Sequence, residues 1–370
     1  MTNISKEQNI ERSGRIESAL SIIKGTLNQY GYTELHLPIY EYYDLLQDTV
    51  FNFSDESIIR FIDRHTGKTL VLRPDFTPQV CRIVSGMENL PLPFRVCYKG
   101  TVFRSVEKDR GIKGEENQTG WEIFGESSIF GDIEIVLTAN AALDKMGLKG
   151  FCFTFGDTLF LNRIKTLAGE KGDKILEAVS DRRTHDLKKL VSEINISQDL
   201  KDLIVKLPLA FGGMDNIDIL AGLSAFDKEL SERIEFIKNL FNQLISCGIN
   251  ENTLIFDAAE SKGLDYYTGV HFEILHESYG SILGSGGRYD KLMSKFGKDL
   301  TACGAALNID NLLHFPICES ASQEYDYLVI GKDNFKKAIS LRKEGKSVIF
   351  VADENQKENF IKNYTFKNII

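Results

Sequence analysis

The 370-residue sequence lacks several features that would point directly to a class of function. Its 44 basic residues are outnumbered by 53 acidic ones, and the net charge of −9 argues against nonspecific binding to nucleic acid. No stretch approaches the roughly 18 apolar residues of a membrane span, and no apolar run follows the first basic residue as in a signal peptide. These absences predict a cytoplasmic protein with no membrane partner.

Metal, redox and phosphate-binding motifs are also missing. The six cysteines show none of the C-x-x-C spacing that zinc and redox sites use, and we expect them to be small buried hydrophobic residues. His271 and His276 lie five apart in a strand-like run, which places them on opposite faces. The turn Gly67-Lys68-Thr69 is similar to the end of a P-loop, but Ile62 stands where that motif requires glycine. We therefore expect neither a metal nor a cofactor.

What the sequence does contain is a division into three parts. Residues 1-160 and 249-318 hold a first helical period and then mostly strand-like stretches joined by short turns. Residues 161-248 are polar and helical, which is typical of an inserted helical subdomain and would make the core discontinuous. Residues 319-370 begin with a polar linker and predict a small βαβα tail.

Four short stretches hold more glycine, tyrosine, carboxylate and arginine than packing alone requires: Leu72-Arg-Pro-Asp-Phe-Thr, Val102-Phe-Arg-Ser-Val-Glu, Lys262-Gly-Leu-Asp-Tyr-Tyr-Thr-Gly and Gly284-Ser-Gly-Gly-Arg-Tyr-Asp. Each has a purely structural explanation. Asp75 could cap a helix, Arg104 could pair with Glu107, and residues 284–287 could form a hairpin turn. Together and in this order they resemble the catalytic core of histidyl-tRNA synthetase, a class II synthetase, from the first helix to about Phe315. The resemblance implies an α+β fold, with a class II aminoacyl-tRNA synthetase-like antiparallel sheet flanked by helices.

The resemblance also implies a histidine pocket. Acidic and neutral acceptors suit the ammonium of a bound amino acid, and the family holds that group at positions that are here Asp75, Thr77, Gln118 and Glu122. The family packs and hydrogen-bonds the imidazole with two tyrosines, which fall on Tyr266 and Tyr267.

The ATP-binding part of the family pattern is altered. Three arginines are expected to meet the negative charge of the adenylate. Arg104 matches the first, Lys262 replaces the second, and we expect both to remain in the ligand pocket. The third belongs to the pattern Gly-x-x-x-Gly-x-Glu-Arg, which falls on Gly304-Ala-Ala-Leu-Asn-Ile-Asp-Asn, so that Asn308, Asp310 and Asn311 all depart from it. Because losing one such donor typically costs about 3 kcal/mol or more, we expect no proficient adenylation.

The tail adds to this picture because it is much shorter than the anticodon-binding domain of the synthetases and has no basic excess, so we expect no tRNA partner. The whole combination resembles the regulatory subunit of ATP phosphoribosyltransferase. That family has no catalysis of its own and activates a short-form catalytic subunit for the first step of histidine biosynthesis, which histidine inhibits. The resemblance further implies a homodimer within a hetero-octamer.

Two other functions stay open from the sequence. A divergent histidyl-tRNA synthetase could work with Arg104 and Lys262, and pyrophosphate exchange dependent on histidine and ATP would distinguish it. An amino-acid-binding protein acting on an unrelated partner is the other possibility.

Overall fold

A computed structural model describes residues 6–46, 57–105, 114–261, 266–317 and 324–370 of the chain. It contains two compact units. One comprises residues 23–316, and the other comprises residues 1–22 together with 317–370. Each unit is described by itself below.

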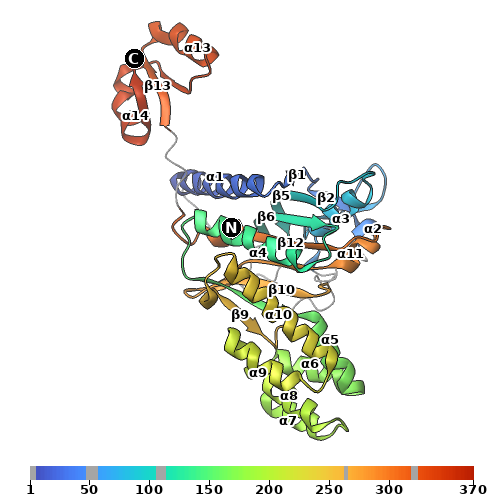
Figure 1. Ribbon diagram of the computed structural model, residues 1–370. Coiled ribbons are helices and arrows are strands. Elements are labelled where there is room, and N and C mark those ends of the chain that lie inside the picture. The colour runs from blue at the N-terminus through green and yellow to red at the C-terminus, as the bar shows by residue number, and fades with distance from the viewer. Residues whose placement is uncertain (1–5, 47–56, 106–113, 262–265, 318–323) are drawn as a thin grey trace. The chain divides into compact units, whose positions relative to one another are not determined.

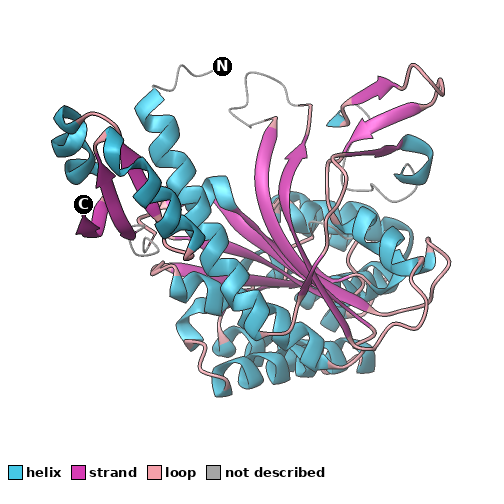
Figure 2. Cartoon of the chain, turned by 90° about the horizontal axis from the view of Figure 1, so that it is seen from above, coloured by secondary structure: helices cyan, strands magenta, loops and turns pink. Residues whose placement is uncertain are grey.

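A nine-stranded sheet forms the centre of the larger unit (Figures 1 and 2). Its order is β1 (Thr33–Glu34), β5 (Phe94–Phe103), β6 (Glu115–Phe124), β12 (Ala302–Asn308), β11 (Tyr279–Arg288), β10 (Val270–His276), β7 (Phe151–Asp157), β9 (Leu254–Asp257) and β8 (Phe211–Gly212). The strands from β5 to β7 pair antiparallel, whereas β1 with β5 and β7 with β9 pair parallel. The α+β architecture with an antiparallel central sheet agrees with the prediction.

Helices cover both faces of this sheet (Figure 2). The chain begins with α1 (Lys6–Gln29), and α4 (Ile129–Lys145) contacts β6, β11 and β12. The Ser128 hydroxyl accepts a hydrogen bond from the Phe130 amide and so fixes the start of α4. Near α3 (Thr77–Ser85) and α11 (Asp290–Ser294) lies a core of buried side chains that includes Phe76, Val80 and Phe124. This core supports the centre of the sheet.

The sheet combines strands from before and after a long helical segment. That segment contains α5 (Thr158–Ala168), α6 (Gly172–Ser180), α7 (Thr184–Ser192), α8 (Gln198–Lys206), α9 (Met214–Ser224) and α10 (Lys228–Ser246). Strands β10, β11 and β12 follow it in the chain but lie between β6 and β7 in the sheet. The segment also contributes β8, which the sequence analysis did not predict because two residues are too short to show an alternation. The predicted domain boundaries themselves remain a prediction.

A small second sheet lies beside the main one (Figure 2). It has the antiparallel order β2 (Tyr40–Tyr42), β4 (Thr69–Leu72) and β3 (Arg60–Ile62), and α2 (Tyr43–Leu46) follows β2 directly. The Arg73 guanidinium follows β4 and donates hydrogen bonds to the carbonyl oxygens of Leu37 and Thr101. These bonds tie the small sheet to β5.

The smaller unit contains a parallel three-stranded sheet of order β14 (Val348–Val351), β13 (Glu324–Ile330) and β15 (Thr365–Ile369). Helix α13 (Phe335–Lys343) packs against one set of apolar side chains from this sheet, and α14 (Lys357–Asn363) packs against another set. The sequence predicted only βαβα. Strand β15 was missed because Thr-Phe-Lys-Asn-Ile has just two apolar residues, too few to indicate a strand.

Other expectations have mixed outcomes. No helix in the described ranges is long and apolar enough to cross a membrane. Cys81, Cys97 and Cys303 are buried and Cys152 is half-buried, but Cys247 is exposed, contrary to the expectation of burial. It follows the last turn of α10, where the apolar periodicity of that helix has ended. Cys318 lies outside the described residues.

Candidate functional site

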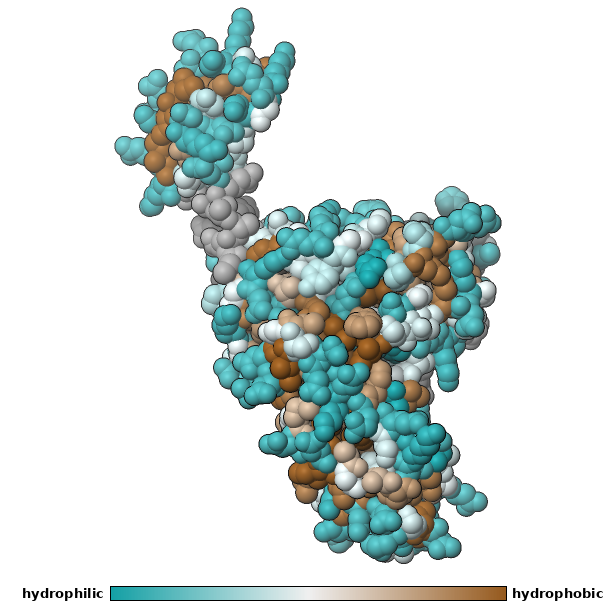
Figure 3. Space-filling model, in the orientation of Figure 1, coloured by the Kyte–Doolittle hydropathy of each residue, from teal (hydrophilic) through white to brown (hydrophobic). Residues whose placement is uncertain are grey.

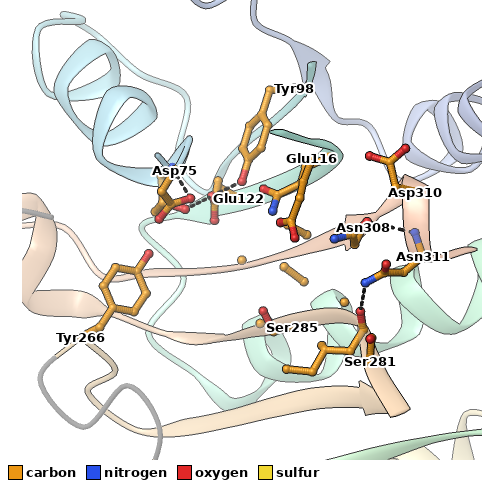
Figure 4. Close-up of a pocket in the computed structure, with 18 of the residues that line it drawn as sticks. Asp75, Tyr98, Glu116, Glu122, Tyr266, Ser281, Ser285, Asn308, Asp310 and Asn311 are labelled. Atoms are coloured by element: carbon orange, nitrogen blue, oxygen red, sulfur yellow. Dashed lines mark hydrogen bonds between the residues drawn. The ribbon is translucent and has the colours of Figure 1, made fainter. Parts of the chain in front are cut away.

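A cavity of about 710 Å³ lies over the centre of the main sheet (Figure 4). It brings together seven of the eight residues predicted to bind the ligand, namely Asp75, Thr77, Arg104, Gln118, Glu122, Tyr266 and Tyr267. Lys262 lies outside the described residues. Among the residues that the structure describes, no group of three or more histidine, cysteine, aspartate or glutamate side chains is arranged to hold a metal ion.

The carboxyl group of Glu122 lies at one end of the cavity, which we call the tyrosine end and define by Asp75, Thr77, Tyr98, Glu122, Tyr266, Tyr267 and Tyr289 (Figure 4). Glu122 is 1% exposed and accepts three hydroxyl hydrogen bonds. Thr77 and Tyr98 donate to Oε1 over 2.9 and 3.0 Å, and Tyr289 donates to Oε2. Because a carboxylate accepts about four hydrogen bonds, these three do not saturate the charged form of Glu122.

Gly304 on β12 makes this position of Glu122 possible. The two residues are paired across β12 and β6. A Cβ atom at position 304 would lie 1.5 Å from Oε2 of Glu122, so any larger residue would have to displace the carboxyl group. The glycine that opens the altered third motif therefore serves the tyrosine end of the cavity.

Burial changes the protonation of the acids here. It raises the pKa of Glu122 to about 8, although the hydroxyls of Tyr289, Thr77 and Tyr98 oppose this rise. Burial also raises the pKa of Asp75, against the opposing charge of Arg104 and two backbone amides. A cationic ligand would favour the charged form of both groups. The tyrosine end is therefore suited to a positive group.

Asp75 lies in the turn before α3, where its Oδ1 accepts the Phe76 amide hydrogen bond over 2.6 Å. Arg104 lies at the end of β5 and donates to the Pro74 carbonyl oxygen and, over 3.1 Å, to Oε2 of Glu116. The possible pairing of Arg104 with Glu107 cannot be assigned, because Glu107 lies outside the described residues. Arg104 is the only lysine or arginine among the described residues that line the cavity.

The other end of the cavity, the asparagine end, is formed by Tyr279, Asn308, Asp310, Asn311 and His314. Both groups of the Asn311 side-chain amide bond to the chain itself. Its Nδ2 donates to the Ile282 carbonyl oxygen over 2.8 Å, and its Oδ1 accepts from the Tyr279 hydroxyl over 3.2 Å. Asp310 accepts the Asn117 amide hydrogen bond over 2.8 Å. A neutral amide and a carboxylate give no electrostatic support to phosphate groups at this end.

The glycines of residues 284–287 do not form the hairpin turn that was one structural explanation for them. They lie inside β11, paired with both β10 and β12. A Cβ atom on Gly286 would lie 2.6 Å from the carbonyl oxygen of Gly304. Glycine clusters occur in turns and also where backbones approach closely, and here close approach explains them.

The cavity also holds residues that were not predicted from the sequence, among them Tyr98, Glu116 and Tyr289. Glu116 could have been found, because alternate residues of β6 share a face and Gln118 and Glu122 were already assigned. Tyr289 lies within the quoted Gly-Gly-Arg-Tyr-Asp stretch but was given no role. Tyr98 shows no local signal, since its place opposite Gly120 depends on the pairing of β5 with β6.

Comparison with known proteins places this chain in a family. Residues 6–312 match the family described as histidyl-tRNA synthetase. An ATP phosphoribosyltransferase regulatory subunit from Clostridium botulinum (strain Langeland) is 30% identical over 348 residues, covering 92% of this chain and 78% of the relative. One from Ruminiclostridium cellulolyticum is 32% identical over 295 residues, covering 79% and 70%.

Solved structures share the fold. A structure described as an ATP phosphoribosyltransferase regulatory subunit/histidyl-tRNA synthetase from Bacillus halodurans has a TM-score of 0.82 at 24% identity and covers 100% of this chain and 96% of its own. A histidyl-tRNA synthetase from Nostoc has a TM-score of 0.74 at 17% identity, with 94% and 85% covered. The fold and the cavity therefore define a class II synthetase core of the histidyl-tRNA synthetase type. Within that class, the chain belongs to the family of ATP phosphoribosyltransferase regulatory subunits.

Proposed function

We propose that this chain is a non-catalytic subunit that binds histidine at the tyrosine end and regulates a separate catalytic subunit. Together with a short-form catalytic subunit, it would support the reaction of ATP with phosphoribosyl pyrophosphate to give phosphoribosyl-ATP, the first step of histidine biosynthesis. The observation that carries the proposal is the contrast within one cavity. Acceptors for an amino acid surround Glu122, whereas the position of the third ATP arginine is Asn311, bonded to its own chain.

The proposed histidine complex uses the charge of the tyrosine end. The ligand ammonium would meet Asp75, Thr77, Gln118 and Glu122, which are carboxyl, hydroxyl and amide acceptors. Its imidazole would lie against Tyr266 and Tyr267, whose rings meet edge to face with centroids 4.9 Å apart. We also propose that Arg104, together with Lys262, contributes to this ligand site.

Adenylation is disfavoured by the same side chains. The attack of a histidine carboxylate on ATP places negative charge on the α-phosphate, and fixed guanidinium groups are the usual stabilisers of that charge. Arg104 is already engaged by Glu116 over 3.1 Å, and Asp310 adds a carboxylate nearby. A synthetase reaction through this cavity therefore lacks the charge that would stabilise its transition state.

Regulation would follow from linkage. If histidine binds one state of the complex more tightly than another, it shifts the complex toward that state, and the substrates of the catalytic subunit change histidine affinity reciprocally. We propose that histidine thereby inhibits the complex as the end product of the pathway. We further propose that the chain forms a homodimer and that these dimers assemble with the catalytic subunit into a hetero-octamer.

Two measurements on the purified chain test this function. Calorimetric titration should detect saturable binding of histidine but not of lysine, which has the same ammonium and carboxylate without the imidazole. Exchange of labelled pyrophosphate into ATP, with histidine present, should stay at background. Exchange at the rate of a genuine synthetase would favour the divergent enzyme instead, and absence of histidine binding would refute the site.

A further inference from the structure

A second concave surface lies in the helical segment, between α7 and α8, at the end of that segment far from the central sheet (Figure 1). Its volume is about 420 Å³. Val205 supplies apolar surface above the buried Val191, and Lys188, Lys201 and Lys206 supply positive charge. We call this surface the lysine groove, and Ser192, Gln198 and Asp202 complete its lining.

The spacing of these residues makes the groove elongated. Residues three or four apart lie on one face of a helix, so Lys201 and Val205 share a face of α8, and Lys188 and Val191 share a face of α7. Nine residues of α8 span about 13 Å at 1.5 Å per residue. The two helices therefore present a surface about two and a half turns long. The surrounding region mixes hydrophilic and hydrophobic residues (Figure 3).

The lysines of the groove differ from most basic residues of the helical segment, which have carboxylate partners. Examples of such ion pairs are Arg163 with Asp227, Lys171 with Glu193, Arg233 with Asp157 and Lys238 with Asp218. In the described part of the chain, by contrast, no carboxylate lies within ion-pair distance of the three groove lysines. A chain of net charge −9 thus keeps an unneutralised positive surface here.

The carboxylate that lines the groove does not neutralise it. Asp202 accepts a hydrogen bond from Nε2 of Gln198 over 2.7 Å, four residues earlier on α8. Three lysines against one aspartate leave an excess of positive charge, and the half-buried Val205 beside them is available for apolar contact, whereas Val191 is only 3% exposed.

We propose that the lysine groove docks an acidic, partly apolar helical segment of the catalytic subunit, an inference that rests on the proposed function. Grooves between helices accept an amphipathic helix whose apolar face lies in the groove, and charges at the rim steer and orient it. Val205 and the aliphatic stems of the lysines would contact the apolar face of the segment, and the ammonium groups of the lysines would contact its carboxylates. A small phosphate ligand fits less well, because only flexible lysines would hold it over an apolar floor.

The experiment measures association of the full chain with the catalytic subunit by fluorescence anisotropy at low and at physiological ionic strength. The test variant combines Lys188→Glu, Lys201→Glu and Lys206→Glu. Lys174→Glu on α6 is the matched control for Lys201→Glu, since Lys174 also lacks a carboxylate partner in the described residues but does not line the groove. The triple variant should bind at least about tenfold more weakly at low salt, mainly through slower association.

The outcomes separate the two proposals. The triple variant should keep the parent melting temperature and histidine affinity, because the groove is distinct from the cavity at Glu122, and the control should bind like the parent. If the parent forms no complex with the catalytic subunit, the proposed function fails and the docking inference with it. If the parent binds but the triple variant binds equally well, or if Lys174→Glu is as damaging as Lys201→Glu, the docking inference alone is wrong. Lysine-dependent capture of tRNA or pyrophosphate without an effect on the complex would also overturn it.

Discussion

The tyrosine end of the cavity includes residues of α3, β5 and β6, whereas the asparagine end includes residues of β11, β12 and α12, and the two ends use their hydrogen bonds differently. At the tyrosine end, three hydroxyl groups donate hydrogen bonds to the Glu122 carboxyl group, which accepts about four in its charged form. At the asparagine end, the Asn311 amide donates to the Ile282 carbonyl oxygen and accepts from the Tyr279 hydroxyl. The first end holds a carboxyl group suited to a cation, whereas the second holds a neutral amide that is bonded to the chain through both its oxygen and its nitrogen.

The difference teaches that a fold can keep the strands and the cavity of a class II synthetase core while the side chains at one end of that cavity depart from the family pattern. The strand and short helix of the altered motif are present as β12 and α12 (Ile309–Leu312), and Gly304 still makes room for Glu122. The side chains that depart from the motif, Asn308, Asp310 and Asn311, lie at the asparagine end. Function therefore has to be argued from side chains rather than from the fold.

The largest expected effect concerns pH. Since the pKa of Glu122 is about 8 in the folded chain and near 4.5 when unfolded, the folded state keeps a proton that the unfolded chain releases. Stability should therefore fall as pH rises between these values. Glu122→Gln removes this loss, so urea unfolding should show the variant gaining about 4 kcal/mol relative to the parent between pH 5 and pH 8. Parallel pH profiles for variant and parent would mean that Glu122 is charged in the empty cavity.

Replacing Gly304 should damage the tyrosine end next most severely. In Gly304→Ala the new Cβ would collide with Oε2 of Glu122, so the carboxyl must move away from the ligand position. Histidine affinity measured by calorimetry should fall by about 100-fold. Gly280→Ala on β11 is the control, because a Cβ there meets nothing within 4 Å. Equal affinities for the two variants would contradict the close approach.

Removing the carboxyl group itself should weaken histidine binding by about 30-fold or more in Glu122→Ala, since losing one carboxylate from a buried cation contact costs about 2 to 5 kcal/mol. Calorimetry in buffers of different ionisation enthalpy should also detect proton release when the parent binds histidine near pH 7, and none from Glu122→Gln. Unchanged affinity in Glu122→Ala would place the ligand elsewhere.

Tyr267→Phe tests the proposed imidazole contact with a smaller effect. It keeps the ring and deletes one hydroxyl, and a single hydrogen bond contributes about 0.5–1.5 kcal/mol, so affinity should fall by no more than about tenfold. Tyr266→Phe provides a comparison within the same pair of rings. If both variants bind histidine like the parent, these hydroxyls do not contact the ligand.

The smallest effect is expected at the asparagine end. Asn311→Arg should leave histidine affinity within about twofold and should not create pyrophosphate exchange, because Asp310 and Glu116 still oppose phosphate and Lys262 still replaces an arginine. A stopped exchange assay run beside the parent checks this. Robust exchange in this variant would show that one guanidinium is all the cavity lacks.

Much of the fold and part of the site could be predicted from the sequence. Gln118 and Glu122 share a face of β6 by simple alternation, and the family motifs named the turn at Asp75 and the tyrosine pair. The contacts that define the site depend on pairings distant in sequence. Tyr289 reaches Glu122 across 167 positions, and no local pattern indicates such a bond. The glycines near Gly286 could have belonged to a turn or to a strand for the same reason. The sequence of one chain does not reveal which strands pair with the segment that contains them.

The central claim is that the tyrosine end is a histidine sensor for another subunit. It is tested most directly by measuring phosphoribosyl-ATP formation by a short-form catalytic subunit mixed with the parent chain or with Glu122→Ala, over a range of histidine concentrations. The account predicts that both chains activate the catalytic subunit and that histidine inhibits the parent complex at concentrations about 30-fold lower than those needed for the variant. Inhibition at the same histidine concentration in both complexes, or activity that depends on neither the chain nor histidine, would contradict it.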